Sequence, residues 1–114
     1  MATWILQSHG ESPIILRLPP VGVKTIGRTA RADFIVDAAL VSRIHCRLTA
    51  DRSDQLVVED LGSTNGTIVN GQKVDRTILR AGDTLTVGRV DFQVSRGTEV
   101  FSTDSGNSVP EVGR

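Results

Sequence analysis

The sequence of 114 residues contains one cysteine, four prolines and no tyrosine, and only 4% of its residues are aromatic. The single cysteine, Cys46, cannot form an internal disulfide, and it fits a reducing compartment. No apolar run approaches the roughly 20 residues that a membrane-spanning helix needs. The first ten residues, MATWILQSHG, lack the basic and apolar segments of a signal peptide. These absences predict a soluble, cytoplasmic domain that does not enter a membrane.

An excess of charge of one sign is also absent, because 13 basic residues balance 13 acidic ones. Proteins that hold nucleic acid by neutralising phosphates usually carry surplus lysine and arginine, so nucleic acid is not an expected partner. The sequence has no CxxC pair, no HExxH motif and no Walker loop, and we expect neither a metal nor a cofactor. A chain of this length suits one compact domain, and we expect a monomer.

What the sequence does contain is the pattern of an all-β protein. Short runs of Val, Ile, Leu and Thr are interrupted every few residues by Gly, Asp, Asn or Pro. This spacing predicts a two-sheet β-sandwich of about eleven short strands. We expect the strands at residues 3–8, 14–18, 23–27, 33–36, 45–50, 55–59, 67–69, 72–74, 77–79, 84–87 and 90–95. The one helix-like interval, residues 36–44, is too short and uncapped to be more than a loop with one turn.

The strand pattern fades after residue 95. Residues 98–114 are rich in Ser, Gly, Thr and acidic residues, and their only adjacent apolar pair is Val100-Phe101. A segment of this composition cannot bury enough apolar surface to fold. We therefore expect a β-sandwich over residues 1–97 and a flexible tail or linker over residues 98–114.

Two Asn-Gly pairs lie five residues apart. Asn70-Gly71 stands between strand-like segments, and both residues accept the positive φ of a type I′ turn, so this pair predicts a hairpin. Asn65-Gly66 instead ends a run of small polar residues, Asp60 to Thr64, that shows no alternation. The groups of this loop could face outward as an anion site, or they could only satisfy the loop's own backbone.

Polar side chains that could carry chemistry lie in two further loops. Arg28 follows a strand, and its guanidinium could present two parallel donors to a phosphate or carboxylate, or simply be solvated. Ser42 and His45 could form a triad with Asp60. The chain lacks a G-x-S-x-G elbow, and so small a sandwich has little room for a closed cleft, so catalysis is not favoured. His45 is better explained as a structural residue that bonds loop backbone.

Together these loops offer cations, hydroxyl donors and an amide, with Asp60 as the only acid. The set comprises Arg28, Ser42, Arg43, Ser63, Thr64 and Asn65. It suits a dianion attached to a polar backbone, such as a phosphorylated peptide. We expect these loops to meet at one end of the sandwich.

In their order and spacing, these residues resemble the forkhead-associated (FHA) domain, a phosphothreonine-binding β-sandwich of eleven strands. The resemblance extends from residue 3 to about residue 95. It is carried by Gly27-Arg28, Ser42-x-x-His45, the segment DLGSTNGT at residues 60–67, Asn70-Gly71, Gly82-Asp83 and Gly88.

The resemblance implies a role for each member of the site. The residues at the phosphate would be Arg28, Ser42, Arg43 and Thr64. Asn65 would bond the main chain of the bound peptide. The residues that support the site would be Gly27, His45 and Gly66, and no catalytic residue is implied.

The function implied is that of a non-catalytic module that binds phosphothreonine-containing proteins or peptides. Its partners would be a Ser/Thr kinase or the substrates of one, in signalling or complex assembly. The alternative is a scaffolding FHA domain that binds partners independently of phosphate. The presence of Arg28, Ser42 and Asn65 favours the first, because a domain without phosphate binding has no chemical need for them.

Overall fold

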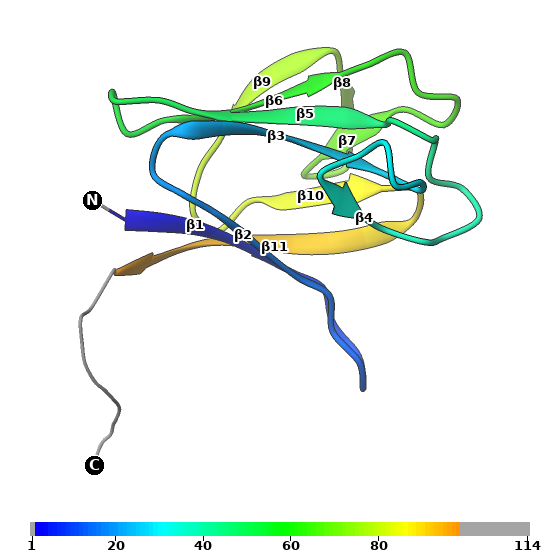
Figure 1. The fold of residues 1–114 in the computed structure, drawn as a ribbon, viewed down its shortest axis with the longest axis horizontal. Coiled ribbons are helices and arrows are strands. Elements are labelled where there is room, and N and C mark those ends of the chain that lie inside the picture. Colours follow the sequence, from blue (N-terminus) through cyan, green and yellow to red (C-terminus); the bar gives the residue numbers. More distant parts are fainter. Residues whose placement is uncertain (1, 99–114) are drawn as a thin grey trace.

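The computed structural model describes residues 2–98, which form eleven strands in two stacked sheets (Figure 1). The strands are β1 (Ala2–Gln7), β2 (Ile15–Leu18), β3 (Gly22–Gly27), β4 (Phe34–Ile35), β5 (Cys46–Ala50), β6 (Leu56–Asp60), β7 (Thr67–Val69), β8 (Gln72–Val74), β9 (Arg76–Leu79), β10 (Thr84–Val87) and β11 (Val90–Thr98). Residues 2–98 contain no α-helix, and hence none long and apolar enough to cross a membrane. The predicted all-β sandwich is confirmed.

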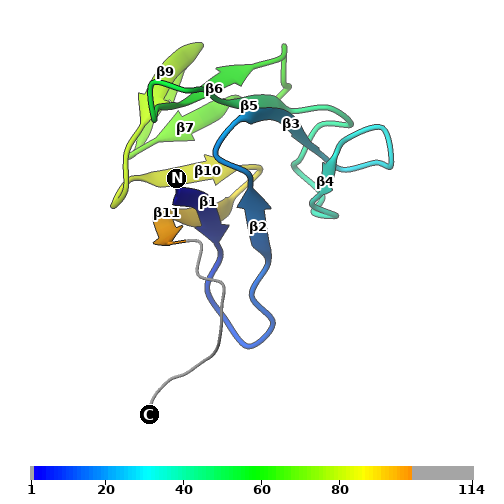
Figure 2. The same cartoon turned by 60° about the vertical axis from the view of Figure 1, so that its left-hand side comes forward.

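The sandwich consists of a six-stranded and a five-stranded sheet, seen as two layers in Figure 2. The first has the order β2-β1-β11-β10-β7-β8 and the second the order β4-β3-β5-β6-β9. All pairs are antiparallel except β3 with β4. Along β5 the buried and half-buried residues alternate, because successive side chains of a strand point to opposite faces.

Most predicted strands lie within two residues of the observed ones, and the differences have local causes. β4 is shorter than expected because the backbone N–H of Asp33 donates to the hydroxyl of Thr25 and not to a backbone carbonyl of a neighbouring strand. β11 is longer because its last residues continue to pair with β1, as far as Ala2 with Thr98. The observed sandwich therefore extends to residue 98, one residue beyond the predicted boundary at residue 97. The rest of the predicted tail, residues 99–114, lies outside the described residues.

The Asn70-Gly71 hairpin is present between β7 and β8. Both residues have positive φ, 51° and 83°, as a type I′ turn requires. The side chain of Asn70 also forms two hydrogen bonds to residues next to and within β10. Its Oδ1 accepts the backbone N–H of Thr84, and its Nδ2 donates to Asp83. This asparagine therefore also ties the hairpin to the neighbouring strand β10.

The core lies between the sheets and is built from apolar side chains of both. Phe92, Leu6, Leu48 and Leu85 have no exposed surface. Cys46 is equally buried, and this burial, together with the charge of Asp60, raises the pKa of its thiol to about 12. Because only the thiolate is reactive, Cys46 acts as a small core side chain.

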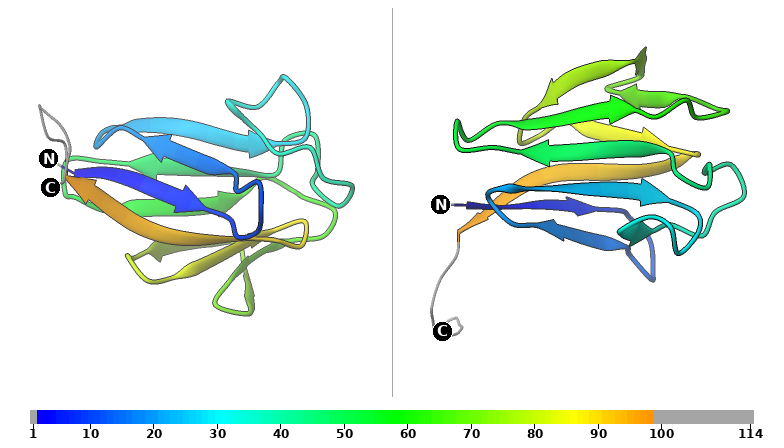
Figure 3. Two further views of the ribbon diagram at one scale, coloured as in Figure 1. Left: turned by 90° about the horizontal axis from the view of Figure 1, so that it is seen from below. Right: turned by 45° about the horizontal axis from the view of Figure 1, so that its top comes forward.

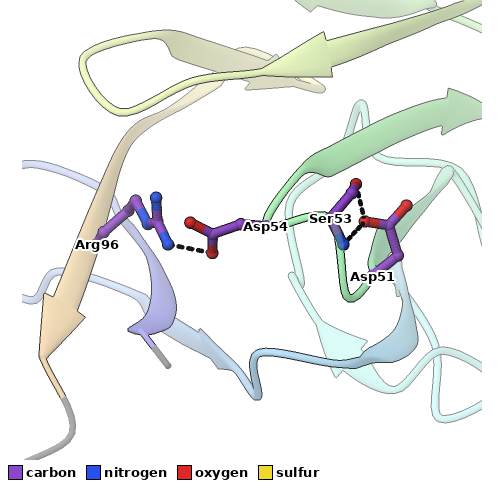
Figure 4. Close-up of polar contacts among 4 residues, drawn as sticks. All are labelled: Asp51, Ser53, Asp54 and Arg96. Atoms are coloured by element: carbon purple, nitrogen blue, oxygen red, sulfur yellow. Dashed lines mark hydrogen bonds and ion pairs between the residues drawn. The ribbon is translucent and has the colours of Figure 1, made fainter.

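The two ends of the sandwich differ. β1 begins and β11 ends at one end, whereas the β3–β4, β4–β5 and β6–β7 loops lie at the other (Figures 1 and 3). At the first end, the guanidinium of Arg96 lies 4.7 Å from the ring centroid of Trp4 and forms an ion pair with Asp54. Figure 4 shows this pair beside the β5–β6 turn, where Ser53 donates to Asp51. Arg96 thus links the two sheets at the end away from the loops.

Replacing Phe92 with alanine tests the packing of this core. The Phe92→Ala substitution is expected to lower the free energy of unfolding by about 3–5 kcal/mol, because it removes a fully buried ring and leaves a cavity. Val23→Ala is the control, since Val23 is 54% exposed, and it should change stability by less than about 0.5 kcal/mol. Urea denaturation measures both, and equal effects would contradict the assigned core.

Candidate functional site

The three loops at the far end enclose an open groove of about 410 Å³. Five of the residues predicted to touch a ligand line it, namely Arg28, Ser42, Arg43, Thr64 and Asn65. They come from three segments that are separate in the sequence. The fold therefore brings these side chains together, as the sequence predicts. No carboxylate lines the groove, whereas two guanidinium groups do. The groove therefore favours an anion.

The β4–β5 loop holds two of these side chains through its backbone carbonyls. Nε of Arg28 donates to the carbonyl oxygen of Val41 at 3.0 Å, and Nδ2 of Asn65 donates to that of Leu40 at 2.9 Å. The backbone N–H of Arg28 also donates to the carbonyl of Ser42, at 3.0 Å. One arginine nitrogen is thus used for orientation, which leaves the terminal nitrogens as donors toward the groove.

Ser42 joins the β4–β5 loop to the β6–β7 loop. Its hydroxyl oxygen accepts the backbone N–H of Thr64 at 3.0 Å. A hydroxyl that accepts one bond still has a proton to donate. Ser42 is half-buried, so its remaining donor can serve a ligand in the groove.

His45 lies beneath the groove with no exposed surface. Nδ1 accepts the backbone N–H of Ser42 at 3.1 Å, and Nε2 lies 2.8 Å from the carbonyl oxygen of Gly66. Because Nδ1 is the acceptor, the proton is on Nε2, which donates to Gly66. Both ring nitrogens are therefore occupied by backbone, and neither bonds the Ser42 hydroxyl or Asp60. The imidazole is a structural link, as the sequence indicates, and not part of a catalytic triad.

A comparison with known protein families fits this geometry. The profile of the FHA domain matches residues 24–88, which include every predicted site residue. The chain belongs to the FHA domain family.

Two curated relatives share this domain. The chain is 38% identical over 98 residues to the ABC transporter ATP-binding/permease protein Rv1747 of Mycobacterium tuberculosis, covering 86% of this chain and 11% of that protein. It is 37% identical over 82 residues to the glycogen accumulation regulator GarA of Mycolicibacterium smegmatis, covering 72% of this chain and 50% of GarA. The chain thus spans half or less of the length of these relatives.

A solved structure gives the same picture. The FHA domain from the structural and functional analysis of phosphothreonine-dependent FHA domain interactions superposes with a TM-score of 0.75 at 32% identity. The match covers 82% of this chain and 95% of that chain. The relative thus shares both the fold and a third of its sequence with this FHA domain.

The carboxylate of Asp60 holds the β6–β7 loop of this FHA domain together through hydrogen bonds within the loop and to β7. Its carboxylate accepts the hydroxyls of Ser63 and Thr67 and the backbone N–H groups of Gly62 and Ser63. Partial burial disfavours the charged form, but these four hydrogen bonds outweigh it and lower the pKa of Asp60 below its ordinary value of 3.8. Asp60 is therefore ionised at neutral pH, and it is not among the residues that line the groove.

The β4–β5 loop is held between two glycines. A side chain on Gly27 of β3 would place Cβ 2.1 Å from the carbonyl oxygen of Arg43. On the other side, a Cβ on Gly88 of the β10–β11 turn would lie 2.6 Å from the backbone nitrogen of Val41. Both contacts need a residue without Cβ. The β4–β5 loop therefore packs its backbone directly against the backbone of both sheets, at Gly27 and at Gly88.

The structure also changes some expectations. Ser63 does not line the groove, because its hydroxyl donates to Asp60 and accepts the N–H of Gly66. For this residue, the interpretation as a group that satisfies its own loop is the right one. The contact of Gly88 with Val41 was not expected, since the sequence indicates only a turn there. Within residues 2–98 no cluster of three or more His, Cys, Asp or Glu residues could hold a metal ion.

The hydrogen bonds of Asp60 predict a pH-dependent contribution to stability. Since the pKa of the folded state is lowered, the contribution is present above pH 3.8 and is lost as the pH falls through the lower, folded-state value. Asp60→Asn should cost about 1–3 kcal/mol at pH 7 and remove this part of the acid dependence. Denaturation curves between pH 7 and pH 3 measure it. An unchanged slope with pH in the variant would contradict the assignment.

A second substitution tests how the β4–β5 loop is held. Gly27→Ala would push the Arg43 carbonyl away from β3 and is expected to cost about 1–3 kcal/mol of stability. The amide chemical shifts of residues 40–45 should change because the loop that contains the Arg43 carbonyl is displaced. Ala30→Ser adds one heavy atom at an exposed position of the neighbouring loop and serves as the control. Unchanged shifts at residues 40–45 in Gly27→Ala would show that the contact does not position the loop.

Proposed function

We propose that this chain is a non-catalytic module that binds phosphothreonine in partner proteins, as a monomer in the cytoplasm. The observation that carries the proposal is the convergence of Arg28, Ser42 and Arg43 on one open groove without a carboxylate. A phosphate dianion can accept several charge-assisted hydrogen bonds, which this set supplies. The similarity to an FHA domain from work on phosphothreonine-dependent interactions supports the same ligand.

Each residue of the groove then has a distinct part. Arg28, oriented by Val41, and the Ser42 hydroxyl bind the phosphate, with Arg43 as the second cation. Thr64 holds its loop to Ser42 through its backbone and has a hydroxyl free to reach the phosphate. Asn65 exchanges its bond to the Leu40 carbonyl for the main chain of the peptide.

Binding without turnover follows from the same geometry. Both nitrogens of His45 are used by the backbone, so no general base faces the groove. The ligand of such a module is made by a Ser/Thr kinase. We infer that its partners are a kinase of this class or the substrates of one, in signalling or complex assembly.

The proposal is tested with matched peptides that carry threonine, phosphothreonine or phosphoserine. Only the phosphorylated forms should bind, and Arg28→Ala or Ser42→Ala should weaken binding by about 10- to 100-fold, since each removes hydrogen bonds to a charged group. Isothermal titration calorimetry gives the affinities.

Arg52→Ala is the control for the loss of one positive charge, because Arg52 is exposed on the β5–β6 turn at the opposite end. Its affinity should equal that of the unaltered domain. Equal binding of phosphorylated and unphosphorylated peptides would overturn the proposal and favour a scaffolding role instead.

A further inference from the structure

The two Asn-Gly pairs, Asn65-Gly66 and Asn70-Gly71, share a chemical reactivity that phosphate binding does not use. The backbone nitrogen that follows an asparagine can attack Cγ of that side chain and close a five-membered succinimide ring. Glycine in the second position favours this reaction, because it has no Cβ to hinder the approach. Each pair is therefore a candidate site of spontaneous modification, and the fold decides whether it reacts.

The reaction needs no partner other than water. The glycine nitrogen loses its proton to solvent and forms a bond to Cγ, while the bond from Cγ to Nδ2 breaks and ammonia leaves. Water then adds to one of the two ring carbonyls and opens the ring, which gives aspartate or isoaspartate. The net change is the replacement of a neutral side-chain amide by a carboxylate, with an extra methylene group in the backbone of the isoaspartate product.

Asn70-Gly71 is held through its side chain. Oδ1 of Asn70 accepts the backbone N–H of Thr84 at 2.9 Å, and Nδ2 donates to the carboxylate of Asp83 at 3.1 Å. Rotation of the amide toward the nitrogen of Gly71 would break both hydrogen bonds. The carbon that would be attacked is therefore fixed against β10.

Asn65-Gly66 is held in a different way, through the attacking nitrogen. Gly66 is buried, and its N–H donates to the hydroxyl oxygen of Ser63 at 2.9 Å. The same hydroxyl donates to Asp60, which fixes its direction. This hydrogen bond stabilises the protonated form of the Gly66 nitrogen and so opposes the loss of its proton. The Asn65 side chain is exposed, with Nδ2 bonded to the carbonyl of Leu40.

Neither residue of this pair can be exchanged for a less reactive one without cost. Gly66 has φ of 88°, which residues with a side chain rarely adopt, and a Cβ there would lie 2.7 Å from Cε of Lys73. Asn65 lines the groove, where the proposed function uses its amide to bind the main chain of the ligand. The fold and the ligand thus require a reactive dipeptide at the groove, and its protection has to come from another residue.

From these observations we infer that Asn65 is a latent deamidation site and that Ser63 protects it by holding the nitrogen of Gly66. This role accounts for Ser63, whose side chain does not line the groove. Only the consequence of the reaction rests on the proposed function. A carboxylate at residue 65 would bring negative charge into a groove that has two guanidinium groups and no carboxylate, so it would oppose an anionic ligand.

The test follows both asparagines in the folded domain during incubation at mildly alkaline pH, with peptide mapping by mass spectrometry. Asn65 should react more slowly in the domain than in a synthetic peptide of residues 62–69. Ser63→Ala should speed its conversion to aspartate and isoaspartate about 2- to 10-fold, since the variant lacks one hydrogen bond. Ser63→Thr, which keeps a hydroxyl, should retain the protection.

Asn70 is the internal control, because loss of the whole fold would speed both reactions whereas release of Gly66 speeds only one. Ser53→Ala is the matched substitution, since Ser53 also donates its hydroxyl to an aspartate, in the β5–β6 turn (Figure 4). It should leave the rate at Asn65 unchanged. Equal rates at Asn65 in the Ser63→Ala and unaltered domains, or equal acceleration at Asn70, would overturn the inference. A rate at Asn65 that is as high in the folded domain as in the peptide would overturn it without any variant.

A binding measurement separates this inference from the proposed function. Asn65→Asp, which reproduces one product of the reaction, should bind a phosphothreonine peptide about 10-fold more weakly than the unaltered domain. Undiminished binding would overturn the consequence assigned to the reaction. Failure of the unaltered domain to bind any phosphopeptide would overturn the proposed function alone, because the reaction rates are measured without ligand.

Discussion

The loop end of this FHA domain, where the groove lies, depends on one buried imidazole. His45 accepts the N–H of Ser42 with one nitrogen and donates to the carbonyl of Gly66 with the other. These two residues belong to different loops, so a single rigid ring fixes the distance between them. A neutral histidine suits this task because it can donate and accept at opposite sides of the ring. The hydrogen bond from Thr64 to Ser42 then adds a second link between the same loops.

The groups that line the groove are held in place before any ligand arrives. Successive carbonyls of the β4–β5 loop, from Leu40 to Ser42, accept hydrogen bonds from Asn65 and from the side chain and backbone of Arg28. Side chains that are already ordered lose less conformational entropy on binding. In this arrangement the β4–β5 loop is anchored by hydrogen bonds from both of its neighbours.

Local pattern sufficed to predict the strands, and the resemblance to the FHA domain named five of the residues that line the groove. The alternation in β5 and the Asn70-Gly71 turn are local features, and the spacing of Arg28, Ser42 and Asn65 identified the loops that meet. The contact of Gly88 with Val41 could not be predicted, because it joins residues far apart in the sequence and leaves no periodic trace. The direction of the Ser63 hydroxyl was also undetermined, since a loop hydroxyl can bond inward or outward equally well. Packing between loops determines both the contact of Gly88 with Val41 and the direction of the Ser63 hydroxyl.

The pairing of β1 with β11 has a mechanical consequence. Ala2 lies opposite Thr98, so the first and last described residues lie at the end of the sandwich away from the three loops that line the groove. A force that separates these two ends acts along the hydrogen bonds of an antiparallel pair, which run perpendicular to the strands. It would open the ladder one pair at a time, beginning at Ala2 and Thr98, instead of shearing all pairs together. Under such a force the domain yields first at the end of the sandwich opposite the groove.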